Sequence, residues 1–257
     1  MDRATPIGVG LGLVAILVAN VLEGGNPMSL LLLPPMLLVF GGTIGAAVAG
    51  GTMADAKHAV TSLKRAMAWK ATPPAELVPV VVSLADKARR EGLLMLEEAV
   101  KDVDDDFLKR GVALAVDGTD PEELREILEA ELHAKRLEDK HSAKFFNAMG
   151  GYAPTIGIIG TVMGLVHVLE NLSEPDKLGH LIAGAFIATL WGVLSANIMW
   201  LPIGSRLLRI GELEAARMEL VIEGVMAIQA GSNPRVVAQR LRSLLPSTQR
   251  DTEAKAA

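Results

Sequence analysis

The stretch FFNAMGGYAPTIGIIGTVMGLVHVL, residues 145–169, contains no aspartate, glutamate, lysine or arginine. A second uncharged stretch, LGHLIAGAFIATLWGVLSANIMWLPIGS, follows at residues 178–205. A helix needs about 20 apolar residues to cross the hydrocarbon core of a bilayer, and both stretches are long enough. Both are also rich in glycine, alanine and threonine, which let membrane helices pack closely. We therefore predict two membrane-spanning helices that pack against other helices and take part in ion conduction.

Two further uncharged stretches lie near the N-terminus, at residues 4–22 and 24–54. The second has room for a turn at Gly24-Gly25-Asn26-Pro27 and then a full helix. A cleaved signal peptide also begins with an apolar run, but here no basic n-region precedes the first stretch and a second span follows closely. We expect both to be retained spans, with buried core helices as the alternative. The expected fold is all-α: a polytopic membrane protein with four transmembrane helices and a helical cytoplasmic domain.

The composition argues against several classes of protein. Half of the 257 residues are hydrophobic and the mean hydropathy is +0.35, so we expect a membrane part and an aqueous part. The chain has no cysteine, which excludes a disulfide framework and a thiolate site. A net charge of −5 argues against nucleic acid as the main partner. The five histidines have no metal-ligand spacing and no phosphate loop is present, so we expect no enzyme, no metal and no cofactor.

The lysines and arginines indicate how the spans are oriented, because cytoplasmic loops carry an excess of them. They follow span two, precede span three and follow span four: Lys57, Lys64, Arg65, Lys70, Lys135, Arg136, Lys140, Lys144, Arg206 and Arg209. We predict that both termini and the central segment are cytoplasmic. The expected segments are residues 1–54 with spans one and two, a cytoplasmic helical domain at 55–144, channel-lining spans three and four at 145–205, and C-terminal helices with a disordered tail at 206–257.

Local signals predict where the helices of the charged segments begin and end. Pro73-Pro74 should break the chain before a helix that runs up to Arg90. Asp120-Pro121-Glu122-Glu123 supplies an N-cap, a proline at the first helical position and an acid three residues after the cap. We expect a long helix to begin there and to continue through Phe145 into span three. The apolar stripes expected on this helix and on a short helix after Asn233-Pro234 are Leu124, Ile127, Leu128, Leu132 and Leu137, and Val236, Val237, Leu241 and Leu244.

Residues 152–165, YAPTIGIIGTVMGL, and the exit Trp200-Leu201-Pro202-Ile203 resemble the MotA family of flagellar motor stator subunits, within the superfamily that includes TolQ and ExbB. The resemblance covers nearly the whole chain, and MotA has two spans before the cytoplasmic segment where TolQ and ExbB have one. It implies an ion-conducting stator subunit of the bacterial inner membrane. With a MotB-type partner, such a subunit converts H+ or Na+ flow into torque on the rotor protein FliG. The alternatives are a TolQ/ExbB-like motor for envelope processes and a non-conducting membrane scaffold.

None of the four predicted spans contains a carboxylate. An ion that crosses hydrocarbon needs a titratable or coordinating group near the middle of the membrane. If the chain conducts, another chain must supply that carboxylate, and the resemblance implies a single aspartate on the transmembrane helix of the MotB-type partner. The small residues would then line the pathway, with helix packing alone as the alternative. The candidate lining residues are Gly160, Gly164, Ala188 and Gly192.

Thr161 and Thr189 lie within the same stripes of small residues. Their hydroxyls could replace part of the hydration shell of an ion, although a threonine in a membrane helix also bonds to its own carbonyl one turn earlier. The resemblance associates such hydroxyls with sodium, and alanine at the first position with protons. We expect a mild preference for sodium, with a proton as the alternative.

Two prolines and four charged residues are the remaining candidates. Pro154 and Pro202 lack the N–H that a helix uses, so we expect a kink or hinge at each, and the resemblance implies that they couple ion flow to cytoplasmic movement. Outside the spans, the resemblance implies a rotor-binding surface at Arg89, Arg90, Glu97 and Glu98; from the residues alone this is a solvated face. The resemblance also implies a homo-oligomer, five copies around a MotB dimer, embedded in membrane lipid.

Overall fold

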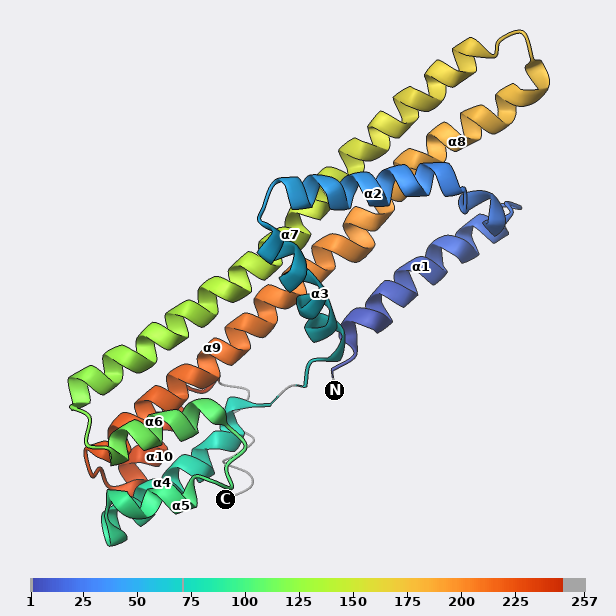
Figure 1. Cartoon of the computed structure of the whole chain (residues 1–257). Helices are drawn as coiled ribbons and strands as arrows, with labels where there is room; N and C mark the ends of the chain where they lie inside the picture. The colour runs from blue at the N-terminus through green and yellow to red at the C-terminus, as the bar shows by residue number, and fades with distance from the viewer. Residues whose placement is uncertain (1, 71, 247–257) are drawn as a thin grey trace. The chain divides into compact units, whose positions relative to one another are not determined.

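The computed structural model describes residues 2–70 and 72–246, and all the regular structure in these residues is helical (Figure 1). They form two compact units. Unit 1 takes in the chain up to Lys70 together with Asp139–Ile210, and unit 2 takes in the stretch between them and the chain after Ile210. Two long helices, α7 (Pro121–Glu170) and α9 (Leu201–Gln229), contribute residues to both units. The tail predicted to be disordered from Ser247 lies outside the described residues.

Unit 1 holds the apolar helices. Within the described residues, three helical stretches are long and apolar enough to cross a membrane: Ala4–Leu22, Pro121–Glu170 and Pro175–Gln229. The first is α1, whose bounds are those predicted from the sequence. The third contains α8 (Pro175–Leu194), a π-helical segment η4 (Ser195–Trp200) and α9. The all-α class with several long apolar helices is therefore confirmed, while the count of four spans stays a prediction.

The helix α2 (Leu33–Ala49) is shorter than the full helix predicted after the turn at Gly24–Pro27. It has 17 residues, because Pro34 and Pro35 can occupy only the first turn of a helix, where no N–H is needed. The preceding residues form a short 3-10 helix, η1 (Pro27–Leu30), instead. At the other end, α2 stops at Gly50-Gly51, and the Thr52 hydroxyl and Asp55 carboxylate form a capping box that starts α3 (Met53–Ala68).

The start of α7 follows the predicted capping signal. The Asp120 carboxylate accepts a 2.9 Å hydrogen bond from the backbone N–H of Glu122, and Pro121 is the first helical residue. From there one helix of 50 residues runs past Phe145 and through Pro154, as predicted. Of its predicted apolar stripe, Leu124, Leu128 and Leu132 are buried, whereas Ile127 and Leu137 are about two-fifths exposed.

Polar contacts link the charged ends of the apolar helices within unit 1. Arg65 on α3 forms an ion pair with Asp139 on α7, whose side chain is almost fully buried. Arg206 on α9 donates a 2.5 Å hydrogen bond to Asp2, and its guanidinium lies 5.4 Å from the centre of the Trp69 ring. A buried charge is tolerated only when it is paired, so we infer that the first pair fixes α3 against the middle of α7 and that the second fixes the start of α1 against the start of α9.

Unit 2 is a helical bundle around an apolar core. It contains α4 (Leu77–Glu91), η3 (Leu93–Met95), α5 (Leu96–Ala99), α6 (Asp106–Val116), α10 (Pro234–Leu244), and the parts of α7 and α9 assigned to it. The helix predicted to run up to Arg90 is α4, and the helix predicted after Asn233-Pro234 is α10. On α10 only Val237 and Leu241 are buried, so the apolar stripe is narrower than predicted.

Glu223 on α9 connects three helices of unit 2. It accepts a 3.0 Å hydrogen bond from Arg125 on α7 and forms an ion pair with Arg240 on α10. The hydrogen bond to Glu223 raises the pKa of Arg125 above its ordinary value. A second contact, 2.8 Å between Arg217 and Asp105, joins α9 to the N-cap of α6. Long-range pairs of this kind fix the register between helices that pack through aliphatic side chains.

The core of unit 2 provides a stability test with a matched control. Leu128 is fully buried and Ile127, its neighbour on α7, is 40% exposed. We expect Leu128→Ala to destabilise the protein by about 2–5 kcal/mol, because it leaves a cavity in the bundle. Ile127→Ala should cost less than about 1 kcal/mol, since exposed substitutions change stability little. Thermal unfolding of the two purified variants would check this, and equal midpoints would contradict the assignment of the core.

Candidate functional site

The apolar parts of α7 and α8 lie side by side with their backbones in close contact (Figure 1). A Cβ atom placed on Gly192 would lie 2.6 Å from the carbonyl oxygen of Ala153 and 3.0 Å from the Cα of Gly157. A Cβ atom on Gly157 would lie 2.9 Å from the carbonyl oxygen of Ala188. Real Cβ atoms do not approach backbone this closely, so only glycine fits at these two positions.

The four small residues predicted to line an ion pathway all lie at this contact. A Cβ atom on Gly160 would lie 2.6 Å from the Cβ of Ala188, and one on Gly164 would lie 2.6 Å from the Cβ of Ala185. Ala188 and Gly192 are buried. Close packing of α7 against α8 is thus sufficient to explain why these positions are small. Their role in lining a pathway stays a prediction.

Thr161 on α7 and Thr189 on α8 are brought together, although 28 residues separate them in the sequence. Their hydroxyl groups hydrogen-bond to each other. The Thr161 hydroxyl also lies 3.0 Å from the carbonyl oxygen of Ala185 and 3.2 Å from that of Gly157, and the Thr189 hydroxyl lies 3.4 Å from the Gly157 carbonyl. The bond from the Thr161 hydroxyl to the Gly157 carbonyl, one turn earlier in the same helix, is the alternative role given for this threonine from the sequence. In the structure this bond exists together with the contact between the two helices.

Four oxygen atoms therefore converge at the Thr161–Thr189 pair: two hydroxyls and two carbonyls. Each hydroxyl has one proton, so two protons are shared among more contacts than they can satisfy at once. Hydroxyl and carbonyl oxygens are the ligands that hard cations prefer. Both threonines are half-buried, so neither side chain is completely enclosed by the packing of the helices. The oxygen types in this cluster are those that can accept a proton donor or a small cation.

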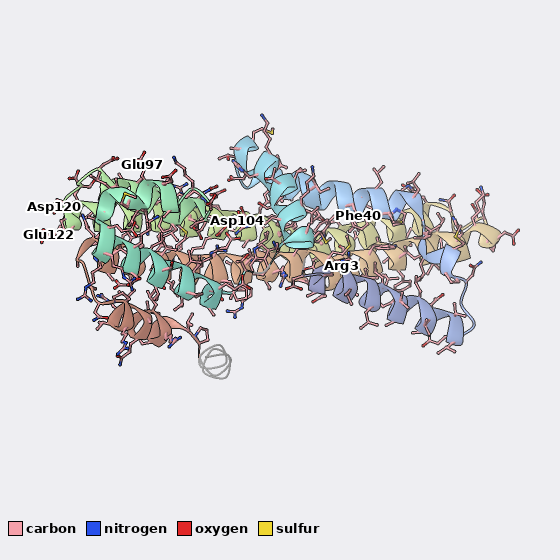
Figure 2. The ribbon with its side chains drawn as sticks, turned by 90° about the horizontal axis from the view of Figure 1, so that it is seen from below. Arg3, Phe40, Glu97, Asp104, Asp120 and Glu122 are labelled. Carbon is pink, nitrogen blue, oxygen red and sulfur yellow. The ribbon has the colours of Figure 1, made fainter. Side chains whose placement is uncertain are left out.

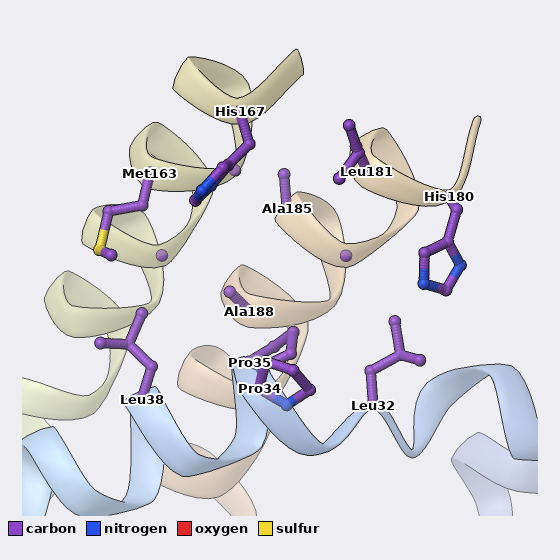
Figure 3. Close-up of a pocket in the computed structure, with 13 residues that line it drawn as sticks. Leu32, Pro34, Pro35, Leu38, Met163, His167, His180, Leu181, Ala185 and Ala188 are labelled. Atoms are coloured by element: carbon purple, nitrogen blue, oxygen red, sulfur yellow. The ribbon is translucent and has the colours of Figure 1, made fainter. Parts of the chain in front are cut away.

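A cavity of about 280 Å³ adjoins the contact between α7 and α8 (Figure 3). Its walls are apolar except for two imidazoles, His167 near the end of α7 and His180 near the start of α8. The cavity includes the first turn of α2, which the sequence analysis did not assign to any site. The lining residues drawn in Figure 3 include Leu32, Pro34, Pro35, Leu38, Met163, Leu181, Ala185 and Ala188. No carboxylate lines this cavity, which agrees with the absence of acidic residues from the apolar stretches.

Pro202 does not end a helix. The backbone changes from α-helical to π-helical over Ser195–Trp200 and returns to α-helical at Leu201. Pro202 has no N–H for the carbonyl of Ile198 and its ring crowds that carbonyl, and a wider π-helical turn relieves both effects. The helix is therefore irregular at the predicted hinge without being broken.

Pro154 interrupts the hydrogen bonds of α7 close to the place where α7 packs against the residues around Pro202. It cannot donate to the carbonyl of Gly150, and a Cβ atom on Gly150 would lie 2.5 Å from the side chain of Leu201. Gly150, whose carbonyl receives no hydrogen bond from Pro154, thus packs against Leu201, the residue before Pro202. The structure brings the two predicted hinge regions together; the hinge motion itself stays a prediction.

The four charged residues predicted to bind a rotor are exposed in unit 2. Arg89 and Arg90 lie in the last turn of α4, and Glu97 and Glu98 lie in the first turn of α5 (Glu97 is labelled in Figure 2). Gly92, at a φ of +92°, turns the chain between them. Arg90 forms an exposed ion pair with Asp86, at 3.1 Å. Two further residues of this surface were not predicted, the exposed Leu94 and Met95, and their apolar side chains lie between the basic and the acidic groups in the sequence.

The described part of the chain contains no group of three or more histidine, aspartate or glutamate side chains that could hold a metal ion. The acidic and basic residues of unit 2 form ion pairs between helices instead. The candidate functional positions of the described residues are therefore the oxygen cluster, the two proline regions and the exposed charges.

Two family models match adjoining parts of the sequence. The model for the N-terminal part of motility protein A matches residues 6–92, and the model for the MotA/TolQ/ExbB proton channel family matches residues 99–220. The chain belongs to the MotA/TolQ/ExbB proton channel family. This is a family of ion channels that drive membrane motors, not a family of enzymes. Family membership and the long apolar helices together indicate a multi-pass protein of the inner membrane.

Within this family, the chain is similar to the motility proteins. It is 38% identical to motility protein A of Bacillus subtilis (strain 168) over 253 residues, which cover 97% of this chain and 93% of the relative. The structure of the flagellar MotAB stator complex from Bacillus subtilis matches with a TM-score of 0.90 and 36% identity, over 97% of this chain and 99% of the other. The structure of C. jejuni MotAB matches with a TM-score of 0.91 and 30% identity, over 96% and 97%. The family predicted from the sequence is confirmed, and the motility proteins are favoured over TolQ and ExbB.

The contact between α7 and α8 predicts how two glycines of α8 will respond to the same substitution. Gly192→Ala should destabilise the protein by about 1–3 kcal/mol, because the added methyl group forces the two backbones apart. Gly184→Ala should be neutral or stabilising, since the nearest atom to a Cβ there is a leucine methyl of Leu32 at 4.0 Å. Thermal unfolding of the purified variants in detergent measures the difference. If both substitutions had the same effect, close helix packing would not be the constraint at Gly192.

Proposed function

We propose that this chain is an ion-conducting stator subunit of a bacterial flagellar motor, with no catalytic activity of its own. The observation that carries the proposal is the oxygen cluster at Thr161 and Thr189, which lies in two apolar stretches, residues 145–169 and 178–205, that contain no carboxylate. An ion in hydrocarbon needs a charged partner. A second chain must therefore bring a carboxylate to this cluster, and the two matching solved structures are of MotAB, MotA together with MotB.

In this proposal the coupling ion is H+ or Na+, with a mild preference for sodium. The hydroxyls of Thr161 and Thr189 and the carbonyls of Gly157 and Ala185 would replace water around a sodium ion while the partner's aspartate supplies the charge. A proton would need the same aspartate but fewer oxygen ligands. Gly160, Gly164, Ala188 and Gly192 would serve the pathway indirectly, since they set the distance between the helices that carry the two threonines.

The proposed assembly is a ring of identical subunits, five by analogy with the family, around a dimer of the MotB-type partner. Both chain ends and the central segment would be cytoplasmic, because basic residues follow span two, precede span three and follow span four. Ion passage would turn the ring, with Pro154 and Pro202 as the flexible points between the membrane helices and the charged segments. The exposed charges at Arg89, Arg90, Glu97 and Glu98 would push a FliG-type rotor protein. Charged contacts suit this role because they attract at a distance and release quickly.

A test of the ion pathway uses a flagellated bacterium that lacks its own stator and carries this chain with its MotB-type partner. Thr161→Val and Thr189→Val keep the shape of the side chain and remove the oxygen, so each should reduce swimming speed about ten-fold or more. The matched Ser variants keep the hydroxyl and should still swim. Thr155→Val is the control, because the Thr155 side chain is exposed and, among the residues that the structure describes, its hydroxyl bonds to the Tyr152 carbonyl of its own helix alone.

Withdrawal of sodium at constant proton-motive force gives the second readout of this experiment. Speed should fall with sodium in the wild type. Unchanged speed would contradict the sodium preference, and normal swimming of both Val variants would contradict the role of the hydroxyls.

A test of the rotor surface reverses single charges in the same cells. Glu97→Lys and Arg89→Glu should each lower swimming speed several-fold, because they place like charges against the rotor. Glu126→Lys is a matched control on α7, since Glu126 is also exposed and lies outside this surface. Membrane levels of each variant are compared by immunoblot. Equal swimming of the Glu97 and Glu126 variants would show that the charges at 89–98 are only a solvated face.

A further inference from the structure

A second cavity in unit 1, of about 480 Å³, lies where α2 gives way to α3, opposite one face of α7. One wall comes from the end of α2 and the start of α3: Ala47, Gly50, Gly51, Thr52 and Asp55. The other wall comes from α7: His141, Lys144, Phe145, Ala148 and Tyr152. The two glycines and two alanines leave the space that larger side chains would fill. None of these residues belongs to the oxygen cluster or to the charged surface.

The cavity spans the level at which the chain passes from charged to apolar sequence. On α7, Lys144 is the last charged residue before the uncharged run that begins at Phe145. On the opposite wall, Asp55 is the first charged residue after the uncharged run that contains α2. Both walls therefore pass from charged to apolar residues within the same cavity. This is the level expected for the boundary between lipid headgroups and hydrocarbon.

The wall on α7 offers three donors in a row. His141, Lys144, Ala148 and Tyr152 are three or four residues apart, so they share one face of the helix. Within the described residues, Lys144 forms no ion pair and the Tyr152 hydroxyl makes no hydrogen bond. Lys144 is thus an uncompensated cation at the polar end of the cavity. Tyr152 stands two turns deeper, where its hydroxyl can still reach polar groups at the interface.

The one acidic group in the cavity is already engaged. The carboxylate of Asp55 accepts hydrogen bonds of 2.8 Å from the backbone N–H and from the hydroxyl of Thr52. These bonds, helped by the charges of His141 and His58, hold the pKa of Asp55 below its usual range. The Asp55 carboxylate is therefore ionised and engaged by Thr52, so the charge of Lys144 is available to a ligand.

We propose that this cavity binds the phosphate group of an anionic glycerophospholipid, whose acyl chains lie along the apolar residues below it. A phosphodiester carries one negative charge and several acceptor oxygens, which match the ammonium of Lys144, the imidazole of His141 and the hydroxyl of Tyr152. Ala47, Phe145 and Ala148 provide the apolar part of the site. Free phosphate shares the chemistry of the headgroup, but it would leave this apolar part without a ligand.

The test uses the full-length protein purified with its MotB-type partner in detergent. Phosphatidylglycerol is added in steps and the bound lipid is counted by native mass spectrometry. Lys144→Gln should weaken binding about five-fold or more, since one basic residue at a membrane surface contributes about that factor. Lys144→Arg should bind like the wild type. Ala148→Leu, which keeps every charge and fills the cavity, should also reduce the lipid retained.

Lys140→Gln is the matched control, because Lys140 is exposed one turn earlier on α7 and does not line the cavity. It should bind phosphatidylglycerol as the wild type does. Equal weakening by Lys140→Gln and Lys144→Gln would overturn the proposal, since it would mean that the lipid responds only to overall charge. Displacement of the lipid by excess inorganic phosphate at constant ionic strength would also overturn it and would assign the site to a soluble phosphate.

Discussion

The backbones of α7 and α8 approach so closely at Gly157 and Gly192 that neither residue has room for a Cβ atom. This contact sets the distance between the two helices, and that distance lets the hydroxyls of Thr161 and Thr189 meet. Membrane helices gain little from the hydrophobic effect when they associate, so close van der Waals contact between small residues must hold them together. The oxygen cluster therefore depends on the packing, because the two hydroxyls meet only if the glycines allow the helices to touch.

The charged residues are distributed differently in the apolar stretches and in unit 2. The uncharged stretches at residues 145–169 and 178–205 carry no aspartate, glutamate, lysine or arginine, and their polar groups are hydroxyls, amides, imidazoles, indoles and backbone carbonyls. Unit 2 has its charges paired between helices, as at Glu223, or exposed at the ends of α4 and α5. A chain of this kind can hold an ion only together with a partner that supplies the countercharge. Its membership of the MotA/TolQ/ExbB proton channel family agrees with that requirement.

The sequence predicted best those features that depend on neighbouring residues. The start of α7 at Pro121, the bounds of α1 and the start of α10 after Asn233 were all predicted from capping residues and uncharged runs. The contact between Gly157 and Gly192 and the pairing of Thr161 with Thr189 were not, because they join residues far apart in the sequence. The helix α2 is shorter than the sequence predicts, because Pro34 and Pro35 confine its start to their own turn. The roles of the candidate site residues depend on a partner chain, and therefore stay predictions.

The π-helical segment Ser195–Trp200 has a consequence for everything that follows it in unit 1. A wider turn takes up one more residue than an α-helical turn, and one residue corresponds to a rotation of about 100° around the helix axis. The apolar face of α9 after this segment is buried at Ile203, Leu207 and Ile210. The extra residue in the wider turn sets the rotation of α9 that directs these three side chains into the core. If one residue were deleted from the segment, the helix could become regular, but these three side chains would rotate out of the core.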